Sequence, residues 1–374
     1  MKYNTGFPVA AAAILVAIPY SIALTAQWLY GWPDKPGYKK YAEALKPRRI
    51  YGLTRAVLGM MKYLKYSRLY FQWKLWYKEN NSNQCVKSIP FGHRGNKLDL
   101  YHSPKINKSD TELLPVVVFV YGGAWGSGER SMYCLLALQL AKELNATVIC
   151  PDYTTYPKGN VLNMVQDISD SLMWVRENGH LFQLNKDNIV LIGHSAGAHL
   201  CALTTLFLLE GTESLFIEPS RQNEIINSIK GLIGLSGVYD IMDHYEHEKT
   251  RGVEYISAMH KAMDGVENFE FYSPTARIRK LNKERLERAN FGLKKPLKMN
   301  MVKRIMGRPR QDECSPQDNA LGLMHLRRLF SELCHPPRHM TQKEQEEKLY
   351  MMLPVFNRVR NRVTCCIVIM RTLK

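Results

Sequence analysis

Ile-Val-Leu-Ile-Gly-His-Ser-Ala-Gly, residues 189–197, is the most specific indication of the fold of this chain. Four apolar residues typical of a buried strand lead into a Gly-x-Ser-x-Gly turn, and residues 196–209 continue as an apolar helix. At such a sharp turn the neighbouring backbone leaves no room for side chains two positions before and after the serine. We therefore predict that Ser195 is a nucleophile on a strand-to-helix elbow. The other elbow residues are Gly193, His194 and Gly197.

A second glycine-rich turn, Tyr-Gly-Gly-Ala-Trp at residues 121–125, directly follows an apolar run at 116–120. Glycines in such a turn leave backbone N–H groups free to face a developing oxyanion. Taken alone, the segment also fits a plain structural turn with an exposed Trp125. Its pairing with the elbow favours an oxyanion-binding loop. The predicted oxyanion donors are Gly122, Gly123, Ala124 and Ala196.

Short apolar runs alternate with helical stretches after Cys85, which is typical of an α/β sheet. The expected strands are 97–101, 116–120, 147–150 and 188–192, and the expected helices are 163–178 and 196–209. Together with the two turns, this pattern predicts an α/β-hydrolase fold, a mostly parallel sheet flanked by helices. We place its core at residues 85–276.

The remaining polar residues near these elements give no general base and no triad acid. His194 and His199 lie beside the nucleophile, whereas the base of this fold follows the acid in chain order, so both are expected to be structural. Four carboxylates have local interpretations. Asp167 and Asp170 are expected on a solvated helix face, and Asp152 and Asp240 as turn caps after apolar strands.

Residues 1–33 are expected to form a transmembrane anchor, because positions 3–33 carry no charged residue and end in an aromatic cluster. A cleaved signal peptide, with a site near Ser21-Ile22-Ala23, is the alternative. Six Lys and Arg residues between positions 35 and 49, against Lys2 before the span, place the hydrolase on the cytosolic side. We expect a single-pass protein of the endoplasmic reticulum or Golgi, with membrane lipid as a partner.

Residues 34–84 form a basic juxtamembrane segment, within which 53–77 mixes basic residues with apolar and aromatic ones. This pattern predicts an amphipathic helix on an anionic membrane surface. A helix packed on the hydrolase fits equally well, and one segment can do both.

The formal charge of +17 does not indicate nucleic-acid binding, because the excess is local, with thirteen Lys and Arg against two acidic residues between 276 and 310. No recognition helix or zinc spacing accompanies it. The eight cysteines form no C-x-x-C pair, so neither a metal nor another cofactor is expected, and Cys150 and Cys201 should be buried thiols. Glycosylation at the sequons of Asn107 or Asn145 would reverse the topology; a third sequon begins at Asn80.

With these segments in place, the chain resembles the isoprenylcysteine alpha-carbonyl methylesterases, α/β-hydrolases at membranes that remove the methyl ester from a prenylated C-terminal cysteine. The resemblance rests on four stretches, at 115–125, 195–199, 234–239 and 271–274. Most hydrolases with this oxyanion loop have His before the two glycines, where Tyr121 stands here. The methylesterases also lack that His, which favours them over the kynurenine formamidases.

The resemblance covers residues 98–276 and then ends. Family members continue with a strand and a His-Gly-x-x-Asp-like loop for the triad acid, then another strand and a loop for the catalytic His. No such motif follows here; the remaining Asp and His residues are Asp312, Asp318, His325, His335 and His339. We therefore expect the last strands to be missing, an open sheet edge, and an atypical basic segment at 277–374, for which disorder stays an alternative.

Three functions stay open from the sequence. The resemblance implies a membrane-associated serine esterase that hydrolyses a prenylcysteine methyl ester, free or on a prenylated protein C-terminus, through a Ser195 acyl-enzyme. An arylformamidase or general carboxylesterase is the second. The third is an inactive, membrane-anchored variant, because a serine without its general base is a poor nucleophile.

Overall fold

A seven-stranded mixed sheet forms the centre of the chain in a computed structural model. The model describes residues 46–61, 67–79, 84–104, 113–254, 257–280 and 367–371, together with isolated positions between 13 and 42. The strand order is β1-β2-β4-β3-β5-β6-β7. The strands are β1 (Cys85–Phe91), β2 (Asn96–Tyr101), β3 (Leu114–Val120), β4 (Thr147–Pro151), β5 (Leu184–His194), β6 (Ile229–Leu235) and β7 (Ile367–Arg371).

The four central strands β4, β3, β5 and β6 are parallel, and the remaining pairs at both edges are antiparallel. The prediction of a mostly parallel sheet therefore holds for the centre only. All four predicted strands are confirmed, each extended by one or more residues. Residues 116–120 of β3 and 189–192 of β5 are fully buried because helices cover both faces of the sheet, which is why these strands are continuous apolar runs.

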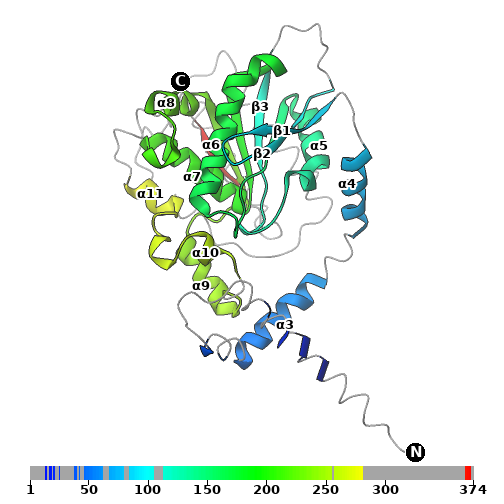
Figure 1. Ribbon diagram of the computed structural model, residues 1–374, viewed down its shortest axis with the longest axis vertical. Coiled ribbons are helices and arrows are strands. Elements are labelled where there is room, and N and C mark those ends of the chain that lie inside the picture. The colour runs from blue at the N-terminus through cyan, green and yellow to red at the C-terminus, as the bar shows by residue number, and fades with distance from the viewer. Residues whose placement is uncertain are drawn as a thin grey trace, which may run out of the picture.

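The helices lie on the two faces of the sheet (Figure 1). Figure 1 shows α6, α7 and α8 on one side, and α5 with α4 outside it on the other. Both predicted helices of the core are confirmed, as α6 and α7. The α-helices are α3 (Pro47–Met61), α4 (Ser67–Glu79), α5 (Cys134–Leu144), α6 (Val161–Asn178), α7 (Ala196–Glu210), α8 (Pro219–Ser228), α9 (Ile241–Arg251), α10 (Met259–Ala262) and α11 (Pro274–Lys280). Short 3₁₀ turns are η2 (Arg130–Tyr133), η3 (Gly179–Phe182), η4 (Glu213–Leu215) and η5 (Val266–Asn268).

The edge of β6 is not open, and in this respect the prediction is wrong. β7, from the atypical segment at 277–374, pairs with β6 in antiparallel register, with Ile233 opposite Ile369. The strand satisfies the backbone groups of β6 that an unpaired edge would leave exposed. The rest of that segment, from residue 281 to 366, lies outside the described residues.

The amphipathic segment predicted at 53–77 falls on two helices, α3 and α4, rather than one. Both contact the hydrolase, so the packed interpretation holds for their inward faces. The predicted anchor at 1–33 lies almost entirely outside the described residues. Among the residues that the structure does describe, no helix is both long enough and apolar enough to cross a bilayer.

The segment from α9 to α11 follows the carboxyl end of β6 and lies against the oxyanion loop. A Cβ placed on Gly126 would stand 2.9 Å from the Cβ of Ala258, next to α10. The side chain of Asn160 also reaches this segment, donating a hydrogen bond to Asp264 at 2.6 Å. The loop after β3 is therefore in contact with the segment between α9 and α11.

Candidate active site

Ser195 occupies the strained turn that its sequence context predicts. β5 ends at His194 and α7 begins at Ala196, and Ser195 between them has φ 51° and ψ −119°. This left-handed conformation is costly for a residue with a Cβ and persists only where the surroundings hold it. Its N–H donates to the carbonyl of Leu235, at the end of β6, over 2.8 Å. The neighbouring strand thus fixes the elbow.

The two elbow glycines are needed for space. A Cβ on Gly197 would lie 2.2 Å from the Val120 carbonyl oxygen and 2.4 Å from that of Tyr121, so α7 starts in direct contact with the end of β3. A Cβ on Gly193 would lie 2.5 Å from Cα of Ala198. These partners are backbone atoms that cannot rotate away.

The oxyanion loop predicted at residues 121–125 reaches the serine. A Cβ on Gly122 would lie 2.9 Å from the Cβ of Ser195 and 2.8 Å from the carbonyl oxygen of His194. Only a residue without a side chain lets the loop come this close. The tertiary structure therefore brings together the two motifs that the sequence separates.

A tight turn holds the rest of this loop. The Gly123 carbonyl accepts hydrogen bonds from the N–H of Gly126 at 3.1 Å, the N–H of Ser127 at 3.0 Å and the Ser127 hydroxyl at 2.9 Å. In a trans peptide the N–H points opposite to the C=O, so the Ala124 N–H points away from this turn. Ala124 and Trp125 have positive φ values of 49° and 60°, as a strained functional loop would.

Trp125 is 2 % exposed, so the exposed tryptophan expected for a plain structural turn is wrong, while the oxyanion role of the loop stays a prediction. Its indole N–H donates to Nδ1 of His199 at 3.1 Å, and Nε2 of His199 lies 2.7 Å from the Tyr272 carbonyl oxygen. Because an indole can only donate and a carbonyl only accept, His199 must carry its proton on Nε2. Burial lowers the pKa of His199 from 6.5 to about 4. The prediction that His199 is structural is therefore confirmed.

His194 is engaged in a similar way. The Tyr133 hydroxyl lies 3.2 Å from Nδ1 of His194, and burial lowers the pKa of this imidazole. Burial also raises the pKa of Tyr133, and the backbone N–H of Gly122 offsets part of the rise. The roles of Gly122, Gly123, Ala124 and Ala196 as oxyanion donors stay predictions.

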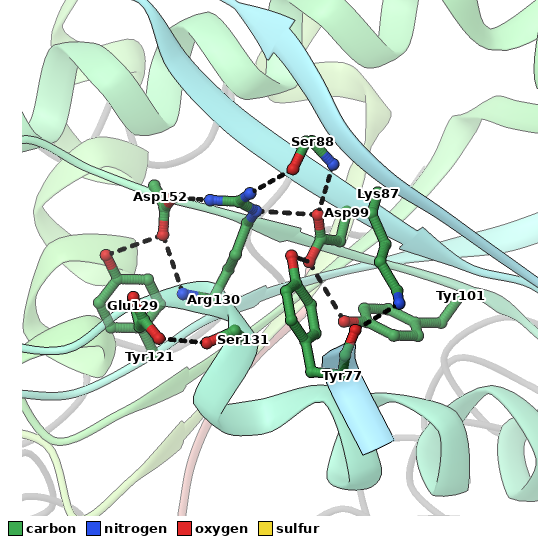
Figure 2. A network of polar contacts seen from close by, with 10 residues as sticks. All are labelled: Tyr77, Lys87, Ser88, Asp99, Tyr101, Tyr121, Glu129, Arg130, Ser131 and Asp152. Carbon is green, nitrogen blue, oxygen red and sulfur yellow. Dashed lines mark hydrogen bonds and ion pairs between the residues drawn. The ribbon is translucent and has the colours of Figure 1, made fainter. Parts of the chain in front are cut away.

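A buried polar network supports the strand end from which the oxyanion loop departs (Figure 2). Arg130 ion-pairs with Asp99 of β2 through Nε at 2.8 Å and with Asp152 through Nη1, and its backbone N–H donates to Asp152 at 2.8 Å. The Tyr121 hydroxyl donates to the same Asp152 at 3.3 Å. Burial raises the pKa of Asp152, and Arg130 offsets part of the rise. The residue that replaces the usual His is thus anchored by an Asp–Arg–Asp bridge.

Two of the predictions for the acidic residues need correction. Asp167 is 1 % exposed, not solvated, because it accepts from Arg94 at 3.0 Å and from the backbone N–H of Thr154 at 2.7 Å. Asp152 is an ion-pair partner rather than a simple turn cap. Asp240 caps α9 as predicted, accepting from the N–H of Asp243 at 3.1 Å. The sequence pattern missed Arg130 and Tyr133, since neither belongs to a recognisable motif.

The triad acid and base are not found in the part of the chain that the structure describes. No described side chain hydrogen-bonds the Ser195 hydroxyl, and the rings of His194 and His199 face Tyr133 and Trp125. Within the same residues, no three His, Cys, Asp or Glu side chains gather as a metal site would require. The described geometry comprises a serine elbow and its loop.

The family follows from a comparison with known proteins. The model of the BD-FAE family, a family of α/β-hydrolases, matches residues 98–284, half of the chain. The chain belongs to the BD-FAE family. Both motifs of the site, together with Tyr133 and Arg130, lie inside the BD-FAE match.

Individual relatives of this BD-FAE member agree with the predicted resemblance, which is confirmed. A probable isoprenylcysteine alpha-carbonyl methylesterase of Arabidopsis thaliana is 37% identical over 233 residues, 61% of this chain and 50% of the relative. A kynurenine formamidase of Danio rerio is 28% identical over 179 residues, 46% of this chain and 54% of the relative. The chain thus spans about half the length of these curated relatives.

A solved structure supports the fold of this BD-FAE member. An inhibited esterase B from Lactobacillus rhamnosis superposes with a TM-score of 0.51 at 16% identity, covering 79% of this chain and 99% of the esterase. At this identity the likeness establishes the α/β-hydrolase fold alone.

Proposed function

We propose that the chain is a membrane-associated serine esterase that hydrolyses a carboxylic methyl ester, with a prenylcysteine methyl ester as its substrate. The approach of Gly122 to Ser195 carries this proposal, because a serine faced by a glycine loop is the arrangement that acyl transfer requires. The substrate class is supported by the methylesterase relatives, one of them 37% identical.

The proposed reaction has two halves. The Ser195 hydroxyl oxygen attacks the ester carbonyl, and the resulting oxyanion is held by N–H groups of Gly123, Ala124 and Ala196. Collapse of this intermediate releases methanol, and water then hydrolyses the acyl-enzyme. Ala196 suits its role because the first N–H groups of a helix have no partner within that helix. Both halves need a base, and no described side chain supplies one.

Membrane attachment is part of the proposal. Residues 1–33 would anchor the chain as a single span in the endoplasmic reticulum or Golgi, with the hydrolase facing the cytosol. The uncharged run at 3–33 and the basic residues that follow it support this arrangement. An anchored enzyme would meet its lipidated substrate in the same bilayer.

Two other functions each have a specific observation in their favour. The formamidase relative at 28% identity supports an arylformamidase, although Tyr121 stands where that loop usually has His. An inactive variant is supported by the hydrogen bonding of His194 and His199, which face Tyr133 and Trp125 rather than the nucleophile. In the arylformamidase Ser195 is a reactive nucleophile, whereas in the inactive variant it is not.

Labelling of the full chain by a fluorophosphonate probe, with Ser195→Ala as the control, tests nucleophilicity directly. We expect Ser195-dependent labelling and Ser195-dependent release of methanol from farnesylcysteine methyl ester. Labelling with turnover of N-formylkynurenine but not of the methyl ester would favour the arylformamidase. No labelling of the full chain would refute the esterase and favour the inactive variant.

A further inference from the structure

The helix α4 presents a fixed inward face to the hydrolase. Three aromatic side chains of α4 pack against the hydrophobic core. They are Trp73 and, one turn later, Trp76 and Tyr77. The Tyr77 hydroxyl donates to Asp99 at 2.9 Å, and the Cys134 thiol lies 3.8 Å from the Trp73 carbonyl oxygen. These contacts fix the rotation of α4 about its axis.

The opposite face of α4 is apolar at its centre. Phe71 and Leu75 are 60% and 54% exposed, and they lie one turn apart on the side away from Trp73 and Trp76. Basic side chains border this pair. They are the exposed Arg68, Lys74 and Lys78. An apolar centre bordered by basic side chains is the composition of a helix face that lies on a membrane surface.

The helix α3 repeats this arrangement. Its inward face is fixed by buried Leu53, by an ion pair between Arg49 and Glu254 at 2.9 Å, and by Gly52, whose added Cβ would lie 2.3 Å from the Arg251 carbonyl oxygen. On its outward face the exposed Tyr51 and Leu58 flank the exposed Arg55. Between residues 46 and 79 the sequence has nine Lys and Arg against one acidic residue.

We propose that the outward faces of α3 and α4 are the surface by which the folded hydrolase lies on an anionic phospholipid bilayer. The inference deepens the membrane association proposed above and rests on it, but it does not depend on esterase activity. Apolar side chains would enter the boundary between headgroups and acyl chains, while the bordering cations meet anionic headgroups. The exposed cations of the two outward faces, Arg55, Arg68, Lys74 and Lys78, select an anionic bilayer over a neutral protein partner.

The position of α3 connects this surface to the candidate active site. α3 contacts the end of α9, which follows β6, and the carbonyl at the end of β6 holds the N–H of Ser195. Ala258, next to α10, contacts the oxyanion loop at Gly126. In Figure 1, α3 lies next to α9 at the end of the molecule where α10 is found. α3 is therefore linked to the candidate active site through α9 and β6.

Photo-cross-linking in the full chain tests the proposal without requiring turnover. Benzoylphenylalanine would replace Phe71 in one sample and Phe216 in the other. Phe216 is the control because it is 82% exposed but lies between η4 and α8, outside α3 and α4. Both samples are bound to vesicles of phosphatidylcholine with about 30 % phosphatidylserine and irradiated. We expect lipid adducts at position 71 and not at position 216.

The charges provide a second arm of the experiment. Each basic residue near such a surface changes the affinity for anionic vesicles about five-fold. Lys74→Gln with Lys78→Gln should therefore lower this affinity about 25-fold, and the adduct yield at position 71 should fall accordingly at limiting lipid. Equal lipid labelling at 71 and 216, adducts between protein chains at 71, or failure of the full chain to bind the vesicles would each overturn the inference. Loss of esterase activity alone would leave these readings unchanged.

Discussion

Replacing His199 with glutamine should change how the stability of the fold depends on pH. The imidazole lies in the core between Trp125 and Tyr272 and is held neutral by burial, with its pKa lowered from 6.5 to about 4. Nearby His244 adds a smaller contribution in the same direction. A protonated ring would lose the hydrogen bond from Trp125, because both nitrogens would then be donors.

The magnitude follows from the two pKa values. In the unfolded chain His199 takes up a proton below about pH 6.5, whereas in the fold it stays neutral until about pH 4. Its contribution to stability is therefore complete above the unfolded pKa and is lost as the pH falls through this window. Between about pH 7.5 and pH 5 the loss amounts to about 2 kcal/mol. Glutamine can accept from Trp125 and donate to Tyr272 but does not titrate.

Urea unfolding of both proteins across this range measures the effect. Burial also lowers the pKa values of His102 and His194. Their contributions to the unfolding free energy are the same in both proteins and cancel in the difference between wild type and His199→Gln. We expect wild type to lose about 2 kcal/mol relative to the variant on acidification. Parallel losses in the two proteins would refute the assignment of a neutral, buried His199. So would an imidazole NMR signal of His199 that titrates near its ordinary pKa, a measurement that needs no variant.

Three further perturbations test other parts of the structure. Gly197→Ala places a Cβ 2.2 Å from the Val120 carbonyl oxygen and should lower the free energy of unfolding in urea by about 3 kcal/mol or more. Gly211→Ala is the control, because its Cβ would have no atom within 4 Å; its φ of 67° alone should cost about 1 kcal/mol. Arg130→Met leaves the buried Asp99 and the partly buried Asp152 without their cation and should cost about 3–5 kcal/mol in urea unfolding. A cost no greater than that of an ordinary surface variant would contradict the bridge. Ile369→Pro should interrupt the pairing of β7 with β6 and speed amide hydrogen exchange in residues 231–235, and unchanged exchange there would argue against this strand pair.

The local order around Ser195 could be predicted because its cause is local. An apolar strand, a turn flanked by two glycines and an apolar helix are contiguous, so one stretch of nine residues carries the steric requirement of the elbow. The strands β2, β3, β4 and β5 and the helices α6 and α7 follow from the same kind of short-range periodicity. By themselves, residues 189–197 and 121–125 determined the fold class and the candidate nucleophile.

Contacts between distant segments could be decided only by the tertiary structure. Asp167 has the helical spacing of a surface residue, yet Arg94 and Thr154 reach it from other elements and bury it. Tyr133 and Arg130 carry no motif, because their roles depend on what lies opposite them in space. β7 covers an edge more than 130 residues away in sequence, since strand pairing depends on which backbone groups remain unpaired and not on side-chain spacing. The spacing of apolar residues predicts which face of a single helix or strand is buried. Which distant residue contacts that face depends on how all the elements pack together.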